Sequence, residues 1–182
     1  IIAGSFFTLI NNLIVGDTGL TMKLFNTPLA AVHAVGNSVV SATMNIISLL
    51  LVFTISSSLA KQYKLDGTIY GTTALVNFFI LMPVGVNEEL GAEIVETSYL
   101  GSQAMFMTFL VAFGTVELLR FLSSFEKLKI KMPDSVPPAI AKSFNGLIPS
   151  IMVVVVFAVI RFFTDLYGTP LNDIIFEVLQ KP

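Results

Sequence analysis

Apolar residues occur along this chain in long runs that short polar segments separate. The runs at 1–15, 37–60, 68–84, 100–122 and 144–163 each approach the roughly 20 residues that a helix needs to cross the hydrocarbon core of a bilayer. Because backbone polar groups find no partners in lipid, such segments cross it as helices. The pattern therefore predicts an all-α membrane protein with five transmembrane helices.

The polar segments between these runs predict the loops and their sidedness. Residues 18–36 are typical of a surface loop with a short interfacial helix, and residues 86–98 form a glutamate-rich loop with no Lys or Arg. Lysine and arginine gather instead in a charged turn at 61–67 and in a basic loop at 123–142. Since basic loops favour the cytoplasm, we expect those two segments inside, and residues 86–98 and 165–182 outside.

The two ends of the chain have different characters. Residue 1 lies within an apolar run and is not an initiator Met, so we expect that the natural start is missing. Near the other end, residues 170–180 place apolar and polar side chains on opposite faces of a helix. The apolar face carries Ile174, Ile175, Val178 and Leu179, and the polar face carries Asp173, Glu177 and Gln180. This pattern predicts an amphipathic helix in the membrane interface, too polar to span it.

Small and polar residues inside the runs predict contacts between helices. Gly67 and Gly71 form a small-x-x-x-small pair, although at a helix entrance glycines also act as caps. The neighbours Asn11 and Asn12 suit either the interface or contact with another part of the protein. The second run contains many Ser and Thr residues, so we expect that helix to be buried among the others.

Composition supports the membrane assignment and excludes several classes of function. Hydrophobic residues make up 54% and charged residues 12% of the 182 residues, whereas soluble domains have about 25% charged residues. A net charge of −2 gives no basic surface for nucleic acid. Without cysteine, disulfides and thiolate metal sites are excluded, and no G-x-x-x-x-G-K-[ST] loop supports direct use of ATP. The sequence predicts no cofactor.

The ionisable residues near helix ends are candidates for function. Glu117 and Arg120 lie three residues apart, and Arg161 and Asp165 lie four apart. Ionisable groups at membrane depth are functional candidates by default, but here an anchor or structural pair is the simpler interpretation. His33 is the only histidine and has no catalytic or metal-binding neighbours in sequence, which favours an ordinary loop histidine. We therefore predict no catalytic residue and no metal site.

The segment 131–144, KMPDSVPPAIAKSF, has the most particular residue choices in the chain. Its three prolines, Pro133, Pro137 and Pro138, each remove a backbone donor and push the preceding residue toward extended geometry, so no uninterrupted helix passes through. The Asp134-Ser135 pair can bond to backbone groups that the prolines leave without partners. The segment therefore predicts a shaped loop.

Five segments together carry a resemblance to a known family. They are 1–12 (IIAGSFFTLINN), 58–67 (SLAKQYKLDG), 116–121 (VELLRF), 131–149 (KMPDSVPPAIAKSFNGLIP) and 168–180 (GTPLNDIIFEVLQ). With them the chain resembles the lactose/cellobiose/diacetylchitobiose family of IIC membrane permeases in the bacterial phosphoenolpyruvate-dependent sugar phosphotransferase system. The match covers essentially the whole chain, and the proline-containing loop is its most specific part.

The resemblance implies a ten-span homodimeric permease of the bacterial plasma membrane, embedded in lipid. Residues 1–182 would form a single membrane domain, the N-terminal half that supplies the scaffold and the dimer contact. The sugar site, with its essential His and Glu, would lie in a second half that this chain lacks. Such a permease carries a β-linked disaccharide to the cytoplasmic IIB protein, which works with IIA and phosphorylates the sugar. The isolated chain is then expected to be an inactive, non-catalytic subunit.

The resemblance also implies candidate site residues in the cytoplasmic loop. Carried over to matching positions, Asp134, Lys142 and Asn145 would order this loop, or provide electrostatics on the phosphate side, near the sugar and the IIB docking area. The alternative is that they only cap and hydrogen-bond the loop. Two other classes of protein remain open, namely a membrane scaffold without transport activity and an unrelated channel or secondary transporter. The latter would need a charged or broken-helix site at the bilayer midplane, where residues here are nearly all apolar.

Overall fold

Helices dominate the computed structural model, which describes residues 1–15, 19–20, 23, 30–87, 91–95, 97–128, 130 and 138–180. The α-helices are α1 (Ile2–Ile10), α3 (Ala30–Ser41), α4 (Ile47–Gln62), α5 (Gly67–Leu81), α6 (Met105–Ser123), α7 (Pro138–Leu166) and α8 (Leu171–Gln180). Shorter helical turns are η1 (Asn11–Val15), η2 (Thr97–Tyr99), η3 (Ser102–Ala104) and η4 (Glu126–Leu128). Within the predicted acidic loop, strands β1 (Gly85–Asn87) and β2 (Ala92–Ile94) pair in an antiparallel hairpin.

Two described helical stretches are long and apolar enough to cross a membrane, Ser102–Ser123 and Phe144–Leu166. Three shorter apolar stretches, Ile2–Ile14, Ile47–Gln62 and Gly67–Leu81, lie at the other predicted spans. At roughly 1.5 Å of rise per residue they reach only about 20–24 Å, less than the ~30 Å of hydrocarbon. Helix length and composition therefore support two of the five predicted membrane spans.

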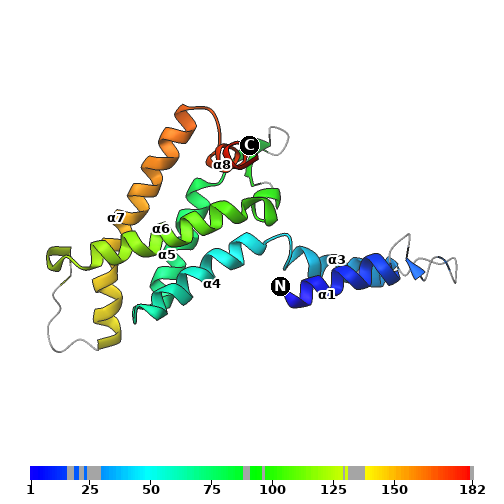
Figure 1. The fold of residues 1–182 in the computed structure, drawn as a ribbon, viewed down its shortest axis with the longest axis horizontal. Coiled ribbons are helices and arrows are strands. Elements are labelled where there is room, and N and C mark those ends of the chain that lie inside the picture. The colour runs from blue at the N-terminus through cyan, green and yellow to red at the C-terminus, as the bar shows by residue number, and fades with distance from the viewer. Residues whose placement is uncertain are drawn as a thin grey trace.

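The core of the molecule lies among α4, α5, α6 and α7 (Figure 1). Its fully buried side chains include Val52, Phe78, Met107, Leu119 and Val153. Buried polar side chains bond across the helix contacts, as is usual between membrane helices. The amide of Asn77 donates to Thr115 Oγ1 at 3.0 Å, and Ser48 Oγ donates to the Gly101 carbonyl at 2.6 Å. These bonds fix the relative position of α5 and α6 along their axes, and that of α4 and η3.

The contact between α4 and α5 depends on two glycines. A Cβ added to Gly67 would lie 2.6 Å from Ser57 Oγ, and one added to Gly71 would lie 2.8 Å from the Phe53 ring. Both distances are too short for a side chain, so α4 and α5 approach each other closely along this stripe. Of the two alternatives for Gly67 and Gly71, the small-x-x-x-small contact is the one the structure supports.

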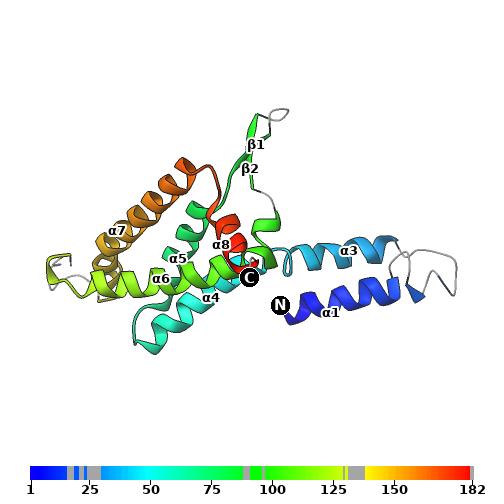
Figure 2. The ribbon, with the colours of Figure 1, turned by 45° about the horizontal axis from the view of Figure 1, so that its top comes forward.

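An arm made of α1, η1 and α3 extends away from the four-helix core (Figures 1 and 2). The segments of this arm pack closely at Gly4 and Gly36. A Cβ added at Gly4 would clash with Thr43, and a Cβ added at Gly36 would clash with Asn11. Asn11 is buried, and its amide donates to Asn37 Oδ1 at 2.8 Å. Of the two predicted environments for Asn11, the structure supports contact with another part of the protein.

The prediction of one continuous helix over residues 37–60 is wrong, because the chain turns at residues 42–46 between α3 and α4. Thr43 Oγ1 donates to the Val39 carbonyl at 2.6 Å, and the Met44 and Asn45 amides both converge on the Val40 carbonyl. That crowding interrupts the regular i to i−4 ladder. Upstream, α3 begins at Ala30, inside the predicted loop 18–36. His33 therefore lies on a helix and not in a loop.

The helix predicted over residues 144–163 is longer in the structure, where α7 runs from Pro138 to Leu166. Proline is favoured in the first turn of a helix, where its missing N–H would have no partner, so Pro138 begins α7 although the prolines predicted a loop to residue 142. Pro149 inside the helix removes one i to i−4 bond, and α7 changes direction along its length (Figure 1). Residues 131–137 of the predicted loop lie outside the described part of the chain.

Helix α8 occupies the predicted amphipathic segment and packs beside α6. Leu171 and Ile175 pack against the core, whereas Val178 is 73% exposed. Only part of the predicted apolar face is thus turned toward the protein. The other part remains free to contact lipid or a neighbour.

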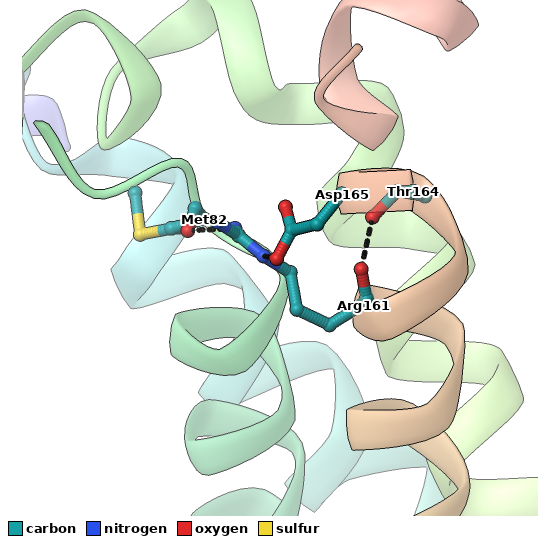
Figure 3. A network of polar contacts seen from close by, with 4 residues as sticks. All are labelled: Met82, Arg161, Thr164 and Asp165. Carbon is teal, nitrogen blue, oxygen red and sulfur yellow. Dashed lines mark hydrogen bonds and ion pairs between the residues drawn. The ribbon is translucent and has the colours of Figure 1, made fainter. Parts of the chain in front are cut away.

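The ends of α5 and α7 are joined by Arg161 (Figure 3). A guanidinium nitrogen of Arg161 donates to the backbone carbonyl of Met82, the residue that caps the C-terminus of α5. Its Nε bonds to Asp165 Oδ2 at 2.8 Å. A cation at a helix C-terminus complements the carbonyl groups that the helix leaves free. The predicted pair of Arg161 and Asp165 is confirmed, and it holds two helices together rather than forming a reaction centre.

Candidate functional site

A cavity of about 280 Å³ lies at the end of the bundle opposite Arg161. It sits where α4 ends, α5 begins, α6 ends and α7 begins. We call it the end cavity. Its lining residues are Lys64, Leu65, Asp66, Ile69, Tyr70, Leu119, Ser123, Asn145 and Gly146.

The end of α4 places a lysine at the cavity. Lys64 adopts a left-handed conformation with φ 59°, which is unusual for a residue other than glycine. The Leu65 amide donates to the Ala60 carbonyl and the Lys64 amide donates to the Lys61 carbonyl, both at 2.9 Å. This pair of bonds is the Schellman arrangement, in which glycine normally occupies the left-handed position. The chain thus retains a cation where backbone geometry favours glycine.

Helix α5 begins beside the cavity with a strong cap. Asp66 Oδ1 accepts from the Thr68 amide at 3.0 Å and from the Ile69 amide at 3.4 Å. One turn later Tyr70 is 5% exposed, and its hydroxyl has no hydrogen-bond partner among the described residues. Ser123 of α6 is close enough to interact with this hydroxyl, but the two groups do not reach hydrogen-bond geometry. The cavity therefore holds a buried donor that a ligand or water could use.

Of the three residues predicted for the site, the structure places Asn145 in the cavity wall. It lies in α7, half-buried, and its Oδ1 is buried without a hydrogen-bond partner in the described part of the chain. Lys142 lies one turn earlier in α7, but its side chain is not described. Asp134 lies outside the described residues. The structure thus positions one of the three.

A surface cluster lies on the α4 side of this end. Tyr63 Oη donates to Glu117 Oε1 at 2.8 Å, Arg120 lies 3.6 Å from Glu117, and the Arg120 guanidinium sits 4.3 Å from the centre of the Tyr63 ring. The bond to Glu117 raises the pKa of Tyr63 above its ordinary value, because it favours the protonated phenol. Glu117 and Arg120 are about half exposed, which agrees with the predicted structural pair.

The end cavity is lined by side chains that can bind a ligand. It offers a lysine cation, an aspartate carboxylate, a tyrosine hydroxyl, a serine hydroxyl and an amide oxygen beside the apolar side chains of Leu65, Ile69 and Leu119. Such groups hold a hydroxyl or a phosphate. Sequence reasoning missed Lys64, Tyr70 and Ser123 as members of the site, because they come from three separate helices. The only sequence signal was the charged turn at 61–67.

A family model and individual known proteins that resemble this chain all describe the same kind of protein. The family model described as "Phosphotransferase system, EIIC" matches residues 1–180. The chain is 37% identical to the oligo-beta-mannoside-specific EIIC component of Bacillus subtilis (strain 168), over 78% of this chain and 33% of that protein. It is 33% identical to the lichenan permease IIC component of the same organism, over 100% of this chain and 42% of that protein.

Among solved structures, the chain is similar to the transporter ChbC, the IIC component of the N,N'-diacetylchitobiose-specific phosphotransferase system. The TM-score is 0.78 at 31% identity, covering 100% of this chain and 43% of that one. The chain therefore spans about a third to two-fifths of the length of the relatives it matches.

Proposed function

Because this chain belongs to the EIIC family of the phosphotransferase system, we propose that it is part of a plasma-membrane permease for a β-linked disaccharide. The observation that carries the proposal is the family match over residues 1–180, together with a matching fold. The relatives are components for oligo-β-mannosides, lichenan and diacetylchitobiose, which favours a substrate of the cellobiose, chitobiose or lactose type. The partners would be cytoplasmic IIB and IIA, and IIB would phosphorylate the sugar.

Within that permease, we propose that residues 1–182 are the scaffold half and that sugar is bound by a further half. Five membrane crossings would place segments 61–67 and 123–142 in the cytoplasm and segments 86–98 and 165–182 outside. Two observations support this orientation. The residues of the end cavity and the Arg161–Met82 bond lie at opposite ends of α5 and α7. Lys61, Lys64 and Arg120 also lie at the end of the bundle that holds the cavity. Basic residues favour the cytoplasmic side of a membrane.

In this arrangement the end cavity faces the cytoplasm. Asp134, Lys142 and Asn145 are then proposed to order the loop that approaches the sugar and IIB. Asn145 supports this role by its place in the cavity wall with a buried, unsatisfied oxygen. The alternative is that these residues only cap and hydrogen-bond the loop.

The proposed function predicts that this chain can replace the matching segment of a full-length relative. Residues 1–182 would be exchanged into the N,N'-diacetylchitobiose-specific IIC protein, and membrane vesicles would be given phosphoenolpyruvate and the soluble phosphotransferase proteins. We expect the hybrid to phosphorylate diacetylchitobiose, because the sugar-binding remainder is supplied. The chain alone should give none. Product formation from labelled sugar is the measurement.

The control for this exchange is the same relative with its matching segment deleted. A hybrid that inserts into the membrane and yet gives no more product than the deletion would contradict the scaffold role. It would favour the alternative of a membrane scaffold without transport activity. Uptake of an unphosphorylated substrate by the chain alone would instead favour an unrelated secondary transporter.

The scaffold proposal also predicts a homodimer. Large apolar side chains on α1 point away from α3 and the core, including Ile2, Phe6 and Leu9, which are 87%, 59% and 65% exposed. Helices with such a face need lipid or protein against it. We expect the purified chain to have the mass of a dimer in mild detergent, measured by light scattering at micromolar concentration. A strictly monomeric mass would count against the dimer.

A further inference from the structure

A second cavity lies where α4 and α6 begin, at the opposite end of these helices from the end cavity. Its volume is about 540 Å³, within the roughly 300–1,000 Å³ that is typical of small-molecule sites. One wall comes from the turn at residues 42–46, where the arm joins the core, and from Ile47 of α4 (Figure 2). The facing wall comes from η2, η3 and Met105 of α6. We call this cavity the junction pocket.

The lining of the junction pocket is polar, and none of its described residues carries a charge. The polar side chains are amides and hydroxyls, which belong to Asn45, Thr97, Ser98, Ser102 and Gln103. Those of Thr97 and Gln103 are exposed and form no hydrogen bond within the described part of the chain. A charged ligand would meet no counter-charge among these residues, whereas a neutral ligand with hydroxyls would meet both donors and acceptors.

Gly101 leaves room beside backbone oxygens in this pocket. An added Cβ at Gly101 would lie 3.5 Å from the Asn45 carbonyl oxygen. Two further carbonyl oxygens, of Thr97 and Ser98, lie 3.7 Å from the same point, and all four residues line the pocket. The Asn45 carbonyl accepts no hydrogen bond from another described residue. The missing side chain thus gives a ligand hydroxyl access to an acceptor that the protein does not use.

Apolar side chains complete the lining of the junction pocket. They are Met44, Ile47 and Met105. A sugar ring carries hydroxyls around its edge and C–H groups on its faces, so it needs polar groups and apolar surface together. Methionine side chains are flexible and adapt to such a shape. The described lining includes no aromatic ring for stacking, so we expect weak binding.

We propose that the junction pocket binds a neutral sugar, a β-linked disaccharide, as it arrives from the outer side of the membrane. This inference rests on the proposed function, which places segment 86–98 outside, and Thr97 and Ser98 belong to that segment. A sugar hydroxyl donates to the Asn45 carbonyl, and the Gln103 amide bonds to a second hydroxyl. Weak binding suits a site from which the sugar passes on to the half that binds it for transport.

The test measures binding of cellobiose to the full chain in phosphatidylcholine nanodiscs, which contain no sugar-headed detergent and leave both faces accessible. Saturation-transfer NMR detects weak contact between the sugar and the protein. We expect a dissociation constant of about 1–10 mM for cellobiose. Sorbitol has hydroxyls but no ring, and it should bind about tenfold more weakly, because a flexible ligand loses more conformational freedom on binding.

The role of the free carbonyl is tested by Gly101→Ala. The added carbon meets its neighbours at ordinary contact distances, and φ −86° suits alanine, so we expect the variant to fold. It should bind cellobiose about fivefold more weakly, the effect of one lost hydrogen bond. Gly114→Ala is the matched control, because its added Cβ also makes an ordinary contact, at 3.7 Å, and lies outside the pocket. It should bind cellobiose as the wild type does.

The role of the amide is tested by Gln103→Leu, which removes hydrogen bonding at an exposed position and keeps a similar volume. We expect cellobiose to bind about fivefold more weakly again. Gln62→Leu makes the same change at the other end of α4, where Gln62 is also exposed, and should leave affinity unchanged. Circular dichroism checks that each variant is helical. Because Gln103 is exposed, its variant remains informative if Gly101→Ala does not fold.

Three results would overturn the proposal. The first is an absence of saturation transfer to cellobiose at roughly tens of millimolar. The second is equal binding of sorbitol and cellobiose, which would mean non-specific contact with polyols. The third is unchanged affinity in both Gly101→Ala and Gln103→Leu, which would place the sugar elsewhere on the chain. Because no phosphoenolpyruvate is present, each of these results would leave the exchange of residues 1–182 as the separate test of the permease.

Discussion

Replacing Gly71 by leucine is expected to destabilise the protein by about 3 kcal/mol, because the new side chain must enter the contact between α4 and α5. The first added carbon already lies 2.8 Å from the Phe53 ring and 3.2 Å from the Phe53 backbone carbonyl. The ring can shift, but the carbonyl belongs to a helix and cannot. Chemical unfolding in detergent, followed by far-ultraviolet circular dichroism, measures the effect.

A matched pair of alanine substitutions separates this contact from helix propensity. Gly114 lies in α6, and its added Cβ would meet only Phe157 Cζ at an ordinary 3.7 Å. Gly114→Ala should therefore stabilise the protein by up to about 1 kcal/mol through better helix propensity. Gly71→Ala gains the same propensity but meets the clash. We expect Gly71→Ala to be less stable than Gly114→Ala by about 2 kcal/mol. Equal effects would show that α4 and α5 are not held this closely.

The apolar pattern was enough to predict the helical class and the positions of the main helices. It failed where a local hydrogen bond decides the structure. The turn at residues 42–46 interrupts an apolar run, because Thr43 bonds back to Val39 and crowds the backbone, and hydropathy does not register such a bond. Similarly, prolines at 137–138 predicted a loop, yet proline also begins helices, and α7 starts at Pro138.

The end cavity was harder to predict than the fold, because its members are far apart in sequence. Only Asn145 was among the predicted site residues, and that prediction came from the family resemblance. Tyr70 and Ser123 look like ordinary helix residues until α5, α6 and α7 are packed together. Lys64 belongs to a turn that the charges predicted, but its left-handed backbone follows from the bond geometry at the end of α4. Sites assembled from several helix ends have no local signature.

The second large effect is expected at Arg161, which joins the ends of α5 and α7. Arg161→Met keeps the aliphatic stem but removes the bonds to the Met82 carbonyl and to Asp165. Arg161 is 24% exposed, so solvent replaces these bonds only in part. Hydrogen bonds from charged groups contribute about 1.5–3 kcal/mol, and we expect a loss of about 2 kcal/mol in the same unfolding measurement.

Two further variants distinguish the helix-joining bond from the ion pair. Asp165 is 55% exposed, so Asp165→Asn should cost less than about 1 kcal/mol while the bond to Met82 remains. Arg161→Lys keeps the charge but lacks the planar fork that reaches both partners at once, so its stability should fall between wild type and Arg161→Met. If Asp165→Asn were as damaging as Arg161→Met, the ion pair would be the main contribution. The bond from α7 to the C-terminus of α5 would then contribute little, and the crossing of these helices would depend on side-chain packing such as that of Val153.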